Sequence, residues 1–459
     1  MINESILPEI LNRALDGGGD FAEIFVEETV RNQLHLTGQK IEQAVSGRDW
    51  GAGIRIFLQH QALYAYTNDL SKKGLMSTAK SISQVAQKEK SSLPLNFVRM
   101  RIPDRHPASI NPEKILPGEK IRIMLKADKL ARSVDRLISQ VEVTYLDEVQ
   151  QVLIANSQGV LARDKRTRTR LFIMVIASNN GEKQVGSAGP GAMHGYEFMR
   201  ELDVEAWVNK AAQTASAMIR AQYAPGGQMP VIIQRGFGGV IFHEACGHAL
   251  EATAIAQKAS IFQDKMGQPI ASPILSAVDD GTIPHEWGSS NIDDEGTATE
   301  RTLLIEKGIL KSYMVDLLSG QKLGLNSTGS GRRQSYKFPP VARMRNSFIL
   351  PGNSTLEEMI AETSYGLLAK QMGGGSVNPA TGDFNFAVQE GYLIEKGKIG
   401  QAVRGATLIG NGAKVLHDID MIGHQLELAQ GMCGAASGMV PVNVGQPDLR
   451  VKSLIVGGR

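Results

Sequence analysis

The chain has 459 residues, a length that suits two or three domains. Apolar residues make up 42% and charged residues 21%, the balance of a globular protein that can bury a large core. Its 49 basic and 47 acidic residues give a net charge of +2, which argues against nucleic acid or an acidic membrane surface as a partner. Two cysteines exclude a disulfide framework, so we expect a reducing, cytoplasmic setting.

Neither a signal peptide nor a membrane span is expected. The N-terminus lacks a basic segment followed by an apolar one. The most apolar short run, LFIMVIAS at 171–178, is too short to cross a bilayer, and we interpret it as a buried strand.

The first half of the chain alternates between helical and strand-like patterns. Period-two patterns separated by Gly-containing turns predict an antiparallel sheet with strands in 21–30, 33–46, 51–59 and 62–68. Two or three further strands are expected within 140–156 and 159–178. Helices are predicted over 6–15, 72–88, 118–139 and 203–222, with a Pro-rich connector at 91–120.

The sequence APGGQMP at 224–230 is the best candidate for a domain boundary. Beyond it, short strand-like runs and Gly-rich turns predict a barrel-like β domain with one conspicuous helix. We therefore expect an α+β protein. An N-terminal domain of sheet and helices would span 1–225, either whole or as units of 1–95 and 110–225, and a C-terminal metal-binding domain would span 226–459.

The helix in question carries IFHEACGHAL, which resembles the H-E-x-x-H signature of zinc proteases with one additional residue. His243 and His248 are candidate zinc ligands, because imidazole holds zinc well and a catalytic site needs three protein ligands and a water. Glu244 is the candidate general base, since it could accept the proton of a metal-activated water.

The spacing is specific but geometrically unusual. About 0.01 chance matches to H-E-x-x-x-H are expected in a chain with nine histidines. In a regular helix, however, residues five apart diverge by about 140°. A one-residue π-bulge would return His243 and His248 to one face, and Gly247 offers a flexible backbone inside that turn. The alternative is two helix histidines that only form hydrogen bonds in the core.

The third ligand is open from spacing alone. Cys433, in a distant Gly-rich stretch, is one candidate, although a small buried thiol is its other interpretation. Cys246 is the rival on the same helix, but three ligands from one short helix leave little room for substrate. His424 and Glu251 are weaker rivals, and Glu251 fits better as a support for His248.

Other clusters carry less information. We interpret GFGG at 236–239 as a strand-to-helix turn rather than a phosphate loop. A cation site, a site for a substrate amine or a solvated turn would each explain Asp293, Asp294 and Glu295. A carboxylate clamp and surface charge are equal alternatives for Arg332 and Arg333. Structural roles are expected for the scattered histidines His35, His60, His106 and His194.

Several stretches together resemble the TldD/PmbA family of peptidases: HEACGH, DDEGT, GSGRRQSY, GGGSVNPATGDFNF, GATLIGNG and GMCGAASG, in this order. The resemblance covers nearly the whole chain. The chain keeps the H-E-x-x-x-H motif and the late cysteine, so it resembles the TldD-type subunit. This implies one Zn²⁺ held by His243, His248 and Cys433, with Glu244 as general base.

The resemblance further implies a zinc peptidase for unfolded or short peptides, including maturation of a modified antibacterial peptide. It implies assembly with a PmbA/TldE-type paralogue, with a homodimer as the other possibility. An extended substrate could add as a strand to a sheet edge, which demands little of its side chains. Two alternatives stay open: a non-catalytic peptide-binding or assembly subunit with a structural metal, and an amidase for non-peptide substrates.

Overall fold

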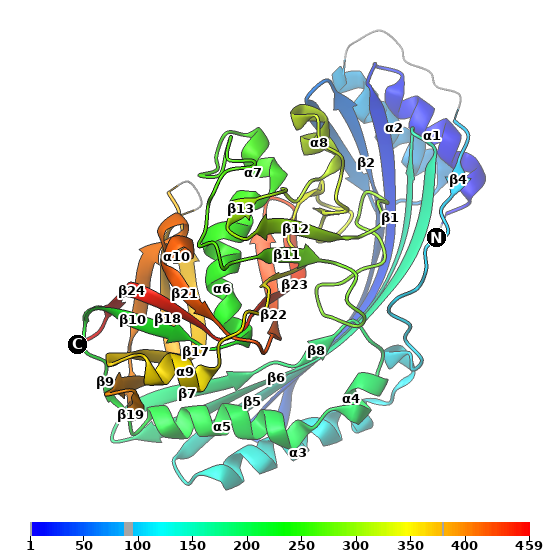
Figure 1. The fold of residues 1–459 in the computed structure, drawn as a ribbon. Coiled ribbons are helices and arrows are strands. Elements are labelled where there is room, and N and C mark those ends of the chain that lie inside the picture. Colours follow the sequence, from blue (N-terminus) through cyan, green and yellow to red (C-terminus); the bar gives the residue numbers. More distant parts are fainter. Residues whose placement is uncertain (1, 87–94, 379–380) are drawn as a thin grey trace.

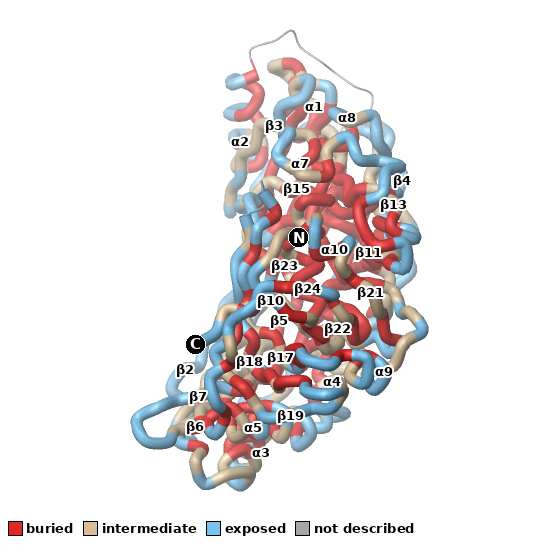
Figure 2. The backbone as a smooth tube through the Cα atoms, turned by 60° about the vertical axis from the view of Figure 1, so that its left-hand side comes forward, coloured by how far each residue is buried: buried red, intermediate tan, exposed pale blue. Residues whose placement is uncertain are grey.

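The computed structural model describes residues 2–86, 95–378 and 381–459. Its architecture is α+β, as the sequence predicts. A long curved sheet with helices forms the N-terminal half, and a β-rich half carries the HEACGH motif (Figure 1). Buried segments occupy the middle of the molecule and exposed segments its outline (Figure 2). None of the described helices has both the length and the apolar character needed to span a bilayer.

The N-terminal sheet has the order β3-β2-β1-β5-β6-β4, with β7 and β8 also paired to β6. Its strands are β1 (Phe21–Thr37), β2 (Lys40–Leu58), β3 (Gln61–Thr67), β4 (Val98–Arg99), β5 (Ile138–Asn156), β6 (Val160–Asn179), β7 (Glu182–Ala188) and β8 (Gly191–Ala192). The prediction of one strand over 33–46 is wrong. Gly38 and Gln39 have φ angles of 55° and 64° and form the turn between β1 and β2.

Helices cover the outer face of this sheet, α1 and α2 at one end and α3 and α5 at the other (Figure 1). The helical segments are η1 (Glu4–Ile6), α1 (Leu7–Leu15), α2 (Lys72–Ala86), η2 (Pro112–Lys114), α3 (Pro117–Val134), α4 (Glu197–Glu201) and α5 (Val204–Met218). All four predicted helices exist, although residues 87 and 88 lie outside the described residues. The helix expected over 118–139 ends at Val134, because extended Asp135 accepts a hydrogen bond from the N–H of Leu137 and leads into β5.

Side chains alternate between the two faces of the sheet. Ile24 and Val26 of β1 pack under α1 and α2, whereas Phe25 packs on the inner face against residues of the C-terminal half. The apolar run at 171–178 follows the same rule, since Leu171 is fully buried and Phe172 is 38% exposed. This run is therefore half-buried rather than a strand enclosed on both faces.

The C-terminal half contains a closed five-stranded barrel in the order β17-β10-β24-β20-β18, with β17 also pairing to β18. A six-stranded sheet of order β13-β12-β11-β16-β23-β22 lies beside it. The barrel and its attached strands are β9 (Gln222–Tyr223), β10 (Gly227–Ile233), β17 (Tyr365–Val377), β18 (Asp383–Glu395), β19 (Lys398–Arg404), β20 (Thr407–Asn411), β21 (Ile419–Ile422) and β24 (Leu449–Gly457). The second sheet contains β11 (Ala277–Asp280), β12 (Arg301–Glu306), β13 (Ile309–Leu310), β16 (Asn346–Ile349), β22 (Glu427–Ala435) and β23 (Gly438–Gln446), and β14 (Gly331–Arg332) pairs with β15 (Val341–Ala342).

Short helices connect these strands: α7 (Ala252–Ala256), α8 (Leu317–Leu323), α9 (Leu356–Ala361) and α10 (Gly412–Asp418). The barrel-like prediction for this half is confirmed.

Buried ion pairs join the two halves. Arg333 donates to Glu23 Oε1 at 2.6 Å and to the carbonyl of Asp294 at 2.8 Å. Arg55 bridges Glu23 Oε2 at 2.8 Å and Glu295 Oε1 at 2.7 Å. All five side chains are less than 5% exposed. The solvated-turn interpretation of 293–295 and the surface-charge interpretation of Arg333 are therefore wrong.

We expect Arg333→Leu to lower the free energy of unfolding by about 3–5 kcal/mol, because it leaves Glu23 buried with one fewer cation. The matched control is Arg48→Leu, which removes a 62% exposed arginine paired with Glu28 and should cost at most about 1 kcal/mol. Guanidinium unfolding followed by circular dichroism measures both. Equal midpoints for the two variants would show that the buried pairs do not hold the halves together.

Candidate metal centre

The two motif histidines lie on a helix that changes its hydrogen-bond pattern twice. The GFGG stretch forms η3 (Gly236–Gly239), a strand-to-helix turn between β10 and α6 (Val240–Phe242), as the sequence predicts. The next segment, η4 (His243–Gly247), is π-helical, and η5 (His248–Leu250) is a 3₁₀ turn. The metal motif therefore coincides with the irregular part of the helix.

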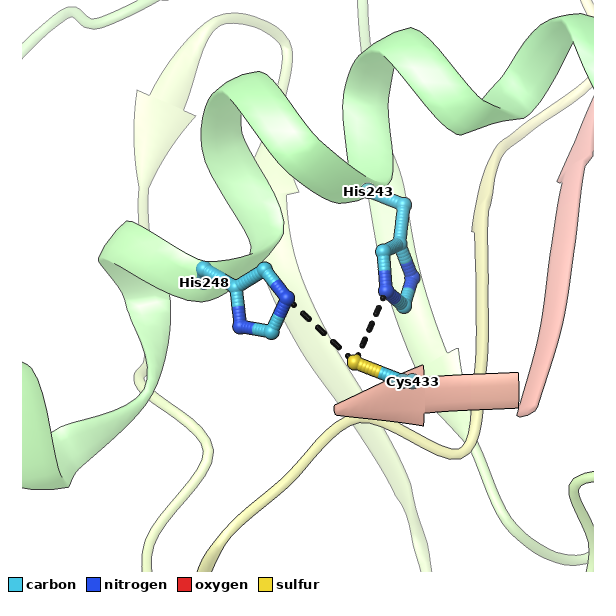
Figure 3. Close-up of side chains that lie close together, drawn as sticks. All are labelled: His243, His248 and Cys433. Carbon is cyan, nitrogen blue, oxygen red and sulfur yellow. Dashed lines mark hydrogen bonds between the residues drawn. The ribbon is translucent and has the colours of Figure 1, made fainter. Parts of the chain in front are cut away.

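The π-turn brings the two histidines together. The N–H of His248 donates to the carbonyl of His243, a hydrogen bond across five residues in place of the α-helical four. The ring centroids lie 5.2 Å apart, and both Nε2 atoms point to the same side of the helix (Figure 3). The predicted bulge is confirmed.

Gly247 contributes to this turn in a different way from the one expected. Its φ and ψ of −56° and −52° are ordinary helical values, so the turn does not need a flexible backbone there. A Cβ at this position would instead overlap the sulfur of Met344, which is fully buried. Close packing, not backbone freedom, requires the glycine.

Cys433 completes the group from a distant part of the chain. It lies on β22, paired with Val440 of β23, and its Sγ is 3.3 Å from Nε2 of each histidine (Figure 3). Among the described residues, the one group of His, Cys, Asp and Glu ligand atoms that could hold a metal is His243, His248 and Cys433, all within 4.8 Å of one another.

The rival ligands lie elsewhere. The Cys246 thiol is fully buried and faces the carbonyl of Gly412 at 3.9 Å. His424 Nδ1 lies 3.1 Å from the carbonyl of Ser354. Glu251 contacts Nδ1 of His248 at 3.1 Å, on the ring edge away from Cys433, which is the position of a group that orients a ligand.

Electrostatics separate the two cysteines. Burial tends to raise the pKa of Cys433, but hydrogen bonds and charge from His243 and His248 outweigh it and lower this pKa to about 4. Burial alone raises the pKa of Cys246. Burial tends to lower the pKa of His248, but Glu251 and Cys433 raise it well above its usual value. At neutral pH Cys433 is thus a thiolate and Cys246 a neutral thiol.

The donor set fits zinc. Two imidazole nitrogens and a thiolate are typical zinc ligands, and a tetrahedral ion would separate nitrogen from sulfur by about 3.5 Å. The observed 3.3 Å is close to that separation. Glu244 lies at the edge of the group, with Oε2 3.7 Å from His248 Nε2 and its side chain 30% exposed, so it can reach both the group and solvent.

Sequence reasoning missed a residue that supports this centre. The fully buried Arg343 donates to the carbonyl of Cys433 at 2.5 Å, and its Nε lies 3.9 Å from Glu251 Oε1. It thereby links the strand that carries Cys433 to the residue that orients His248. The signal available in the sequence was a pair of arginines two residues apart, Arg343 and Arg345, whose side chains would share one face of an extended segment.

The remaining candidates lie outside the metal group. Arg332 is buried, not a surface charge, and donates to the carbonyls of Met344 and Pro441. His106 and His194 are not scattered, because both contact His285. The backbone N–H of His285 donates to His106 Nδ1 at 3.0 Å, and its ring stacks on His194 with centroids 4.0 Å apart.

Gly412, at the start of α10, gives a test of the π-turn. A Cβ there would overlap the backbone carbonyl oxygen of Ala245, inside the turn. Because that oxygen cannot move without the helix, we expect Gly412→Ala to displace the histidines and weaken zinc affinity at least about tenfold. Gly47→Ala is the control, since a Cβ there meets nothing within 4 Å. Competition with a zinc-sensitive dye measures both, and unchanged affinity in Gly412→Ala would contradict the role given to this contact.

Comparison with known proteins gives the family. Three family models of the PmbA/TldA metallopeptidases match successive parts of the chain. Domain 1 matches residues 22–86, the central domain matches 110–219 and the C-terminal domain matches 226–458. A Haemophilus influenzae protein named Metalloprotease TldD homolog is 36% identical over 449 residues, which cover 96% of this chain and 93% of that protein.

More distant relatives agree. The Zinc metalloprotease TldD homolog of Saccharolobus solfataricus is 26% identical, with 98% of this chain and 99% of that protein covered. The crystal structure of TldE from Thermococcus kodakarensis shares the fold with a TM-score of 0.79 at 18% identity, covering 98% of this chain and all of that one. The chain therefore belongs to the PmbA/TldD family and is a metallopeptidase.

Proposed function

We propose that the chain is a zinc-dependent peptidase that hydrolyses peptide bonds of unfolded or short peptides. The observation that carries this proposal is the convergence of His243, His248 and Cys433 with Glu244 beside them. A structural zinc site is closed by four protein ligands, whereas a catalytic site uses three and keeps one position open. The group formed by the described residues has three members, which favours catalysis over a structural metal in a binding subunit.

The residues would divide the work as follows. His243, His248 and Cys433 would hold the zinc, which when bound polarises the scissile carbonyl and makes an attacking water more acidic. Glu244 would accept the proton of that water and transfer it to the departing amine. Glu251 would keep His248 in its ligand orientation through Nδ1.

Substrate binding would use the strand that carries Cys433. β22 is the edge strand of its sheet, and a groove of about 520 Å³ runs between its residues 427–432 and residues 370–374 of β17. An extended peptide in this groove would form backbone hydrogen bonds with an edge strand, which is tolerant of side-chain sequence. Such binding requires an unfolded or short substrate.

A second chain would complete the assembly. The fold shared with TldE supports a paralogous PmbA/TldE-type partner. A homodimer is the other arrangement that this proposal allows.

Glu244→Gln tests the proposed base. We expect zinc to remain bound at one ion per chain, while hydrolysis of an unstructured fluorogenic peptide falls about 10²–10⁴-fold, because the water loses its proton acceptor. Glu357→Gln, at an exposed position on α9, should keep the wild-type rate. Cleavage by Glu244→Gln at the wild-type rate would rule out this assignment.

The ligand set is tested by the zinc content of two cysteine variants. Cys433→Ala should lose the metal when purified without chelators, because only two ligands remain. Cys246→Ala should retain it, since that thiol faces Gly412 instead of the histidines. Elemental analysis gives the zinc content per chain. Zinc retained in Cys433→Ala at the wild-type level would show that Cys433 is not the third ligand.

A further inference from the structure

Strand β6 presents a row of arginines to the C-terminal half. Its sequence RTRTR places Arg166, Arg168 and Arg170 at every second position, and period-two alternation points all three to the inner face of the sheet. There they line a cavity of about 190 Å³ between β6 and the β22–β23 hairpin.

The cavity has an excess of positive charge. Six arginines and three carboxylates line it. Arg166 pairs with Asp294 at 2.5 Å, and Arg31 pairs with Glu148. Arg333 pairs with Glu23, just outside the cavity. These pairs use two of the three lining carboxylates.

The third carboxylate, Asp293, is hydrogen-bonded to the backbone and not to an arginine of the cavity. Its oxygens accept the backbone N–H groups of Glu295, Thr297 and Gly331. Burial raises the pKa of this carboxyl, whereas these three hydrogen bonds lower it.

Three of the arginines have no carboxylate partner among the described residues. Arg168 donates to the carbonyls of Trp287 and Ser289, both at 3.2 Å. Arg332 donates to two carbonyls of the metal-binding half. Burial lowers the pKa of Arg332 to about 9 and that of Arg168 to about 10. A buried cation without a counter-charge is costly, so this cavity favours an anion.

Arg170 connects the cavity to the proposed substrate groove. It donates to the carbonyls of Gly189 and Gln430, both at 3.3 Å, and its guanidinium lies 5.4 Å from the Trp287 ring centre. Arg170 and Met432 line both the cavity and the groove along β22. Met432 directly precedes Cys433 on β22, so the wall shared by the cavity and the groove belongs to the strand that carries the candidate ligand.

We propose that this cavity is a subsite for a carboxylate of the peptide substrate, held by Arg168, Arg170 and Arg332. The inference rests on the proposed peptidase function and deepens it. The planar guanidinium group matches a carboxylate in shape and charge. The side chains of Trp287, Met432 and Met439 would flank the adjoining part of the peptide.

Peptide binding to the zinc-loaded Glu244→Gln variant tests this without catalysis. Three versions of one acetyl-capped hexapeptide serve as probes in calorimetric titrations: a free C-terminal acid, its amide, and the amide with one internal glutamate. We expect the acid to bind at least about tenfold more tightly than the amide if the C-terminus is the ligand. Recovery of affinity by the glutamate-containing amide would identify an acidic side chain as the source.

Arginine variants in the same background show where the carboxylate binds. Arg170→Met should abolish the difference between charged and uncharged peptides, Arg170→Lys should retain part of it, and Arg48→Met should leave it unchanged. Thermal unfolding of each variant checks its folding. If Arg170→Met does not fold, the affinity difference between charged and uncharged peptides is measured in Arg170→Lys instead.

Equal binding of all three peptides would overturn the proposal, and so would no binding of any of them. A preference for the charged peptides that survives the loss of Arg170 would also overturn it, because direct contact between the carboxylate and zinc would give that result. A preference that depends on Arg170, in a protein whose wild type cleaves no peptide, would support the subsite and refute the peptidase proposal alone.

Discussion

The candidate metal centre depends on one backbone hydrogen bond, from the N–H of His248 to the carbonyl of His243. If this segment were α-helical, the two rings would diverge and the thiolate of Cys433 could contact only one of them. Because the π-turn departs from regular helix geometry, both Nε2 atoms lie 3.3 Å from the same sulfur. Such a turn persists only where the surrounding packing favours it.

That packing comes from distant segments. Gly412 lies so close to the turn that a Cβ there would overlap the carbonyl oxygen of Ala245, and a Cβ at Gly247 would overlap the sulfur of Met344. Arg343 holds the carbonyl of Cys433 and lies beside Glu251, so the strand and the helix are positioned by one buried side chain. Ion pairs around Arg333 then fix this half against the curved sheet. The contacts that position the candidate metal centre thus extend from the motif helix to the interface with the curved sheet.

Much of this follows from the sequence, because local patterns determine local structure. Helical periodicity and strand alternation predict the four N-terminal helices and the barrel-like half, and the spacing of His243 and His248 predicts the π-turn. Side-chain partners across the fold could not be predicted, since they depend on which residues face each other. The sequence therefore left a solvated turn open for Asp293 and Asp294 and surface charge open for Arg333, whereas all three side chains are buried. Spacing alone left Cys433 undecided between a third ligand and a small buried thiol, and the family resemblance favoured the ligand. In the structure its sulfur lies beside both histidines.

The row of arginines on β6 shows that residues in the same local pattern can have different electrostatic partners. Arg166, Arg168 and Arg170 share one strand and one face. Within the part of the chain that the structure describes, however, only Arg166 pairs with carboxylates, those of Asp164 and Asp294. The other two lie against carbonyl oxygens, whose partial charge offsets little of the cost of removing a cation from water. This unfavourable desolvation free energy therefore remains in the folded protein, at a cavity lined in part by the strand that carries Cys433. A ligand bearing a negative charge would remove part of it on binding, and this gain is additional to the backbone hydrogen bonds that any peptide could form.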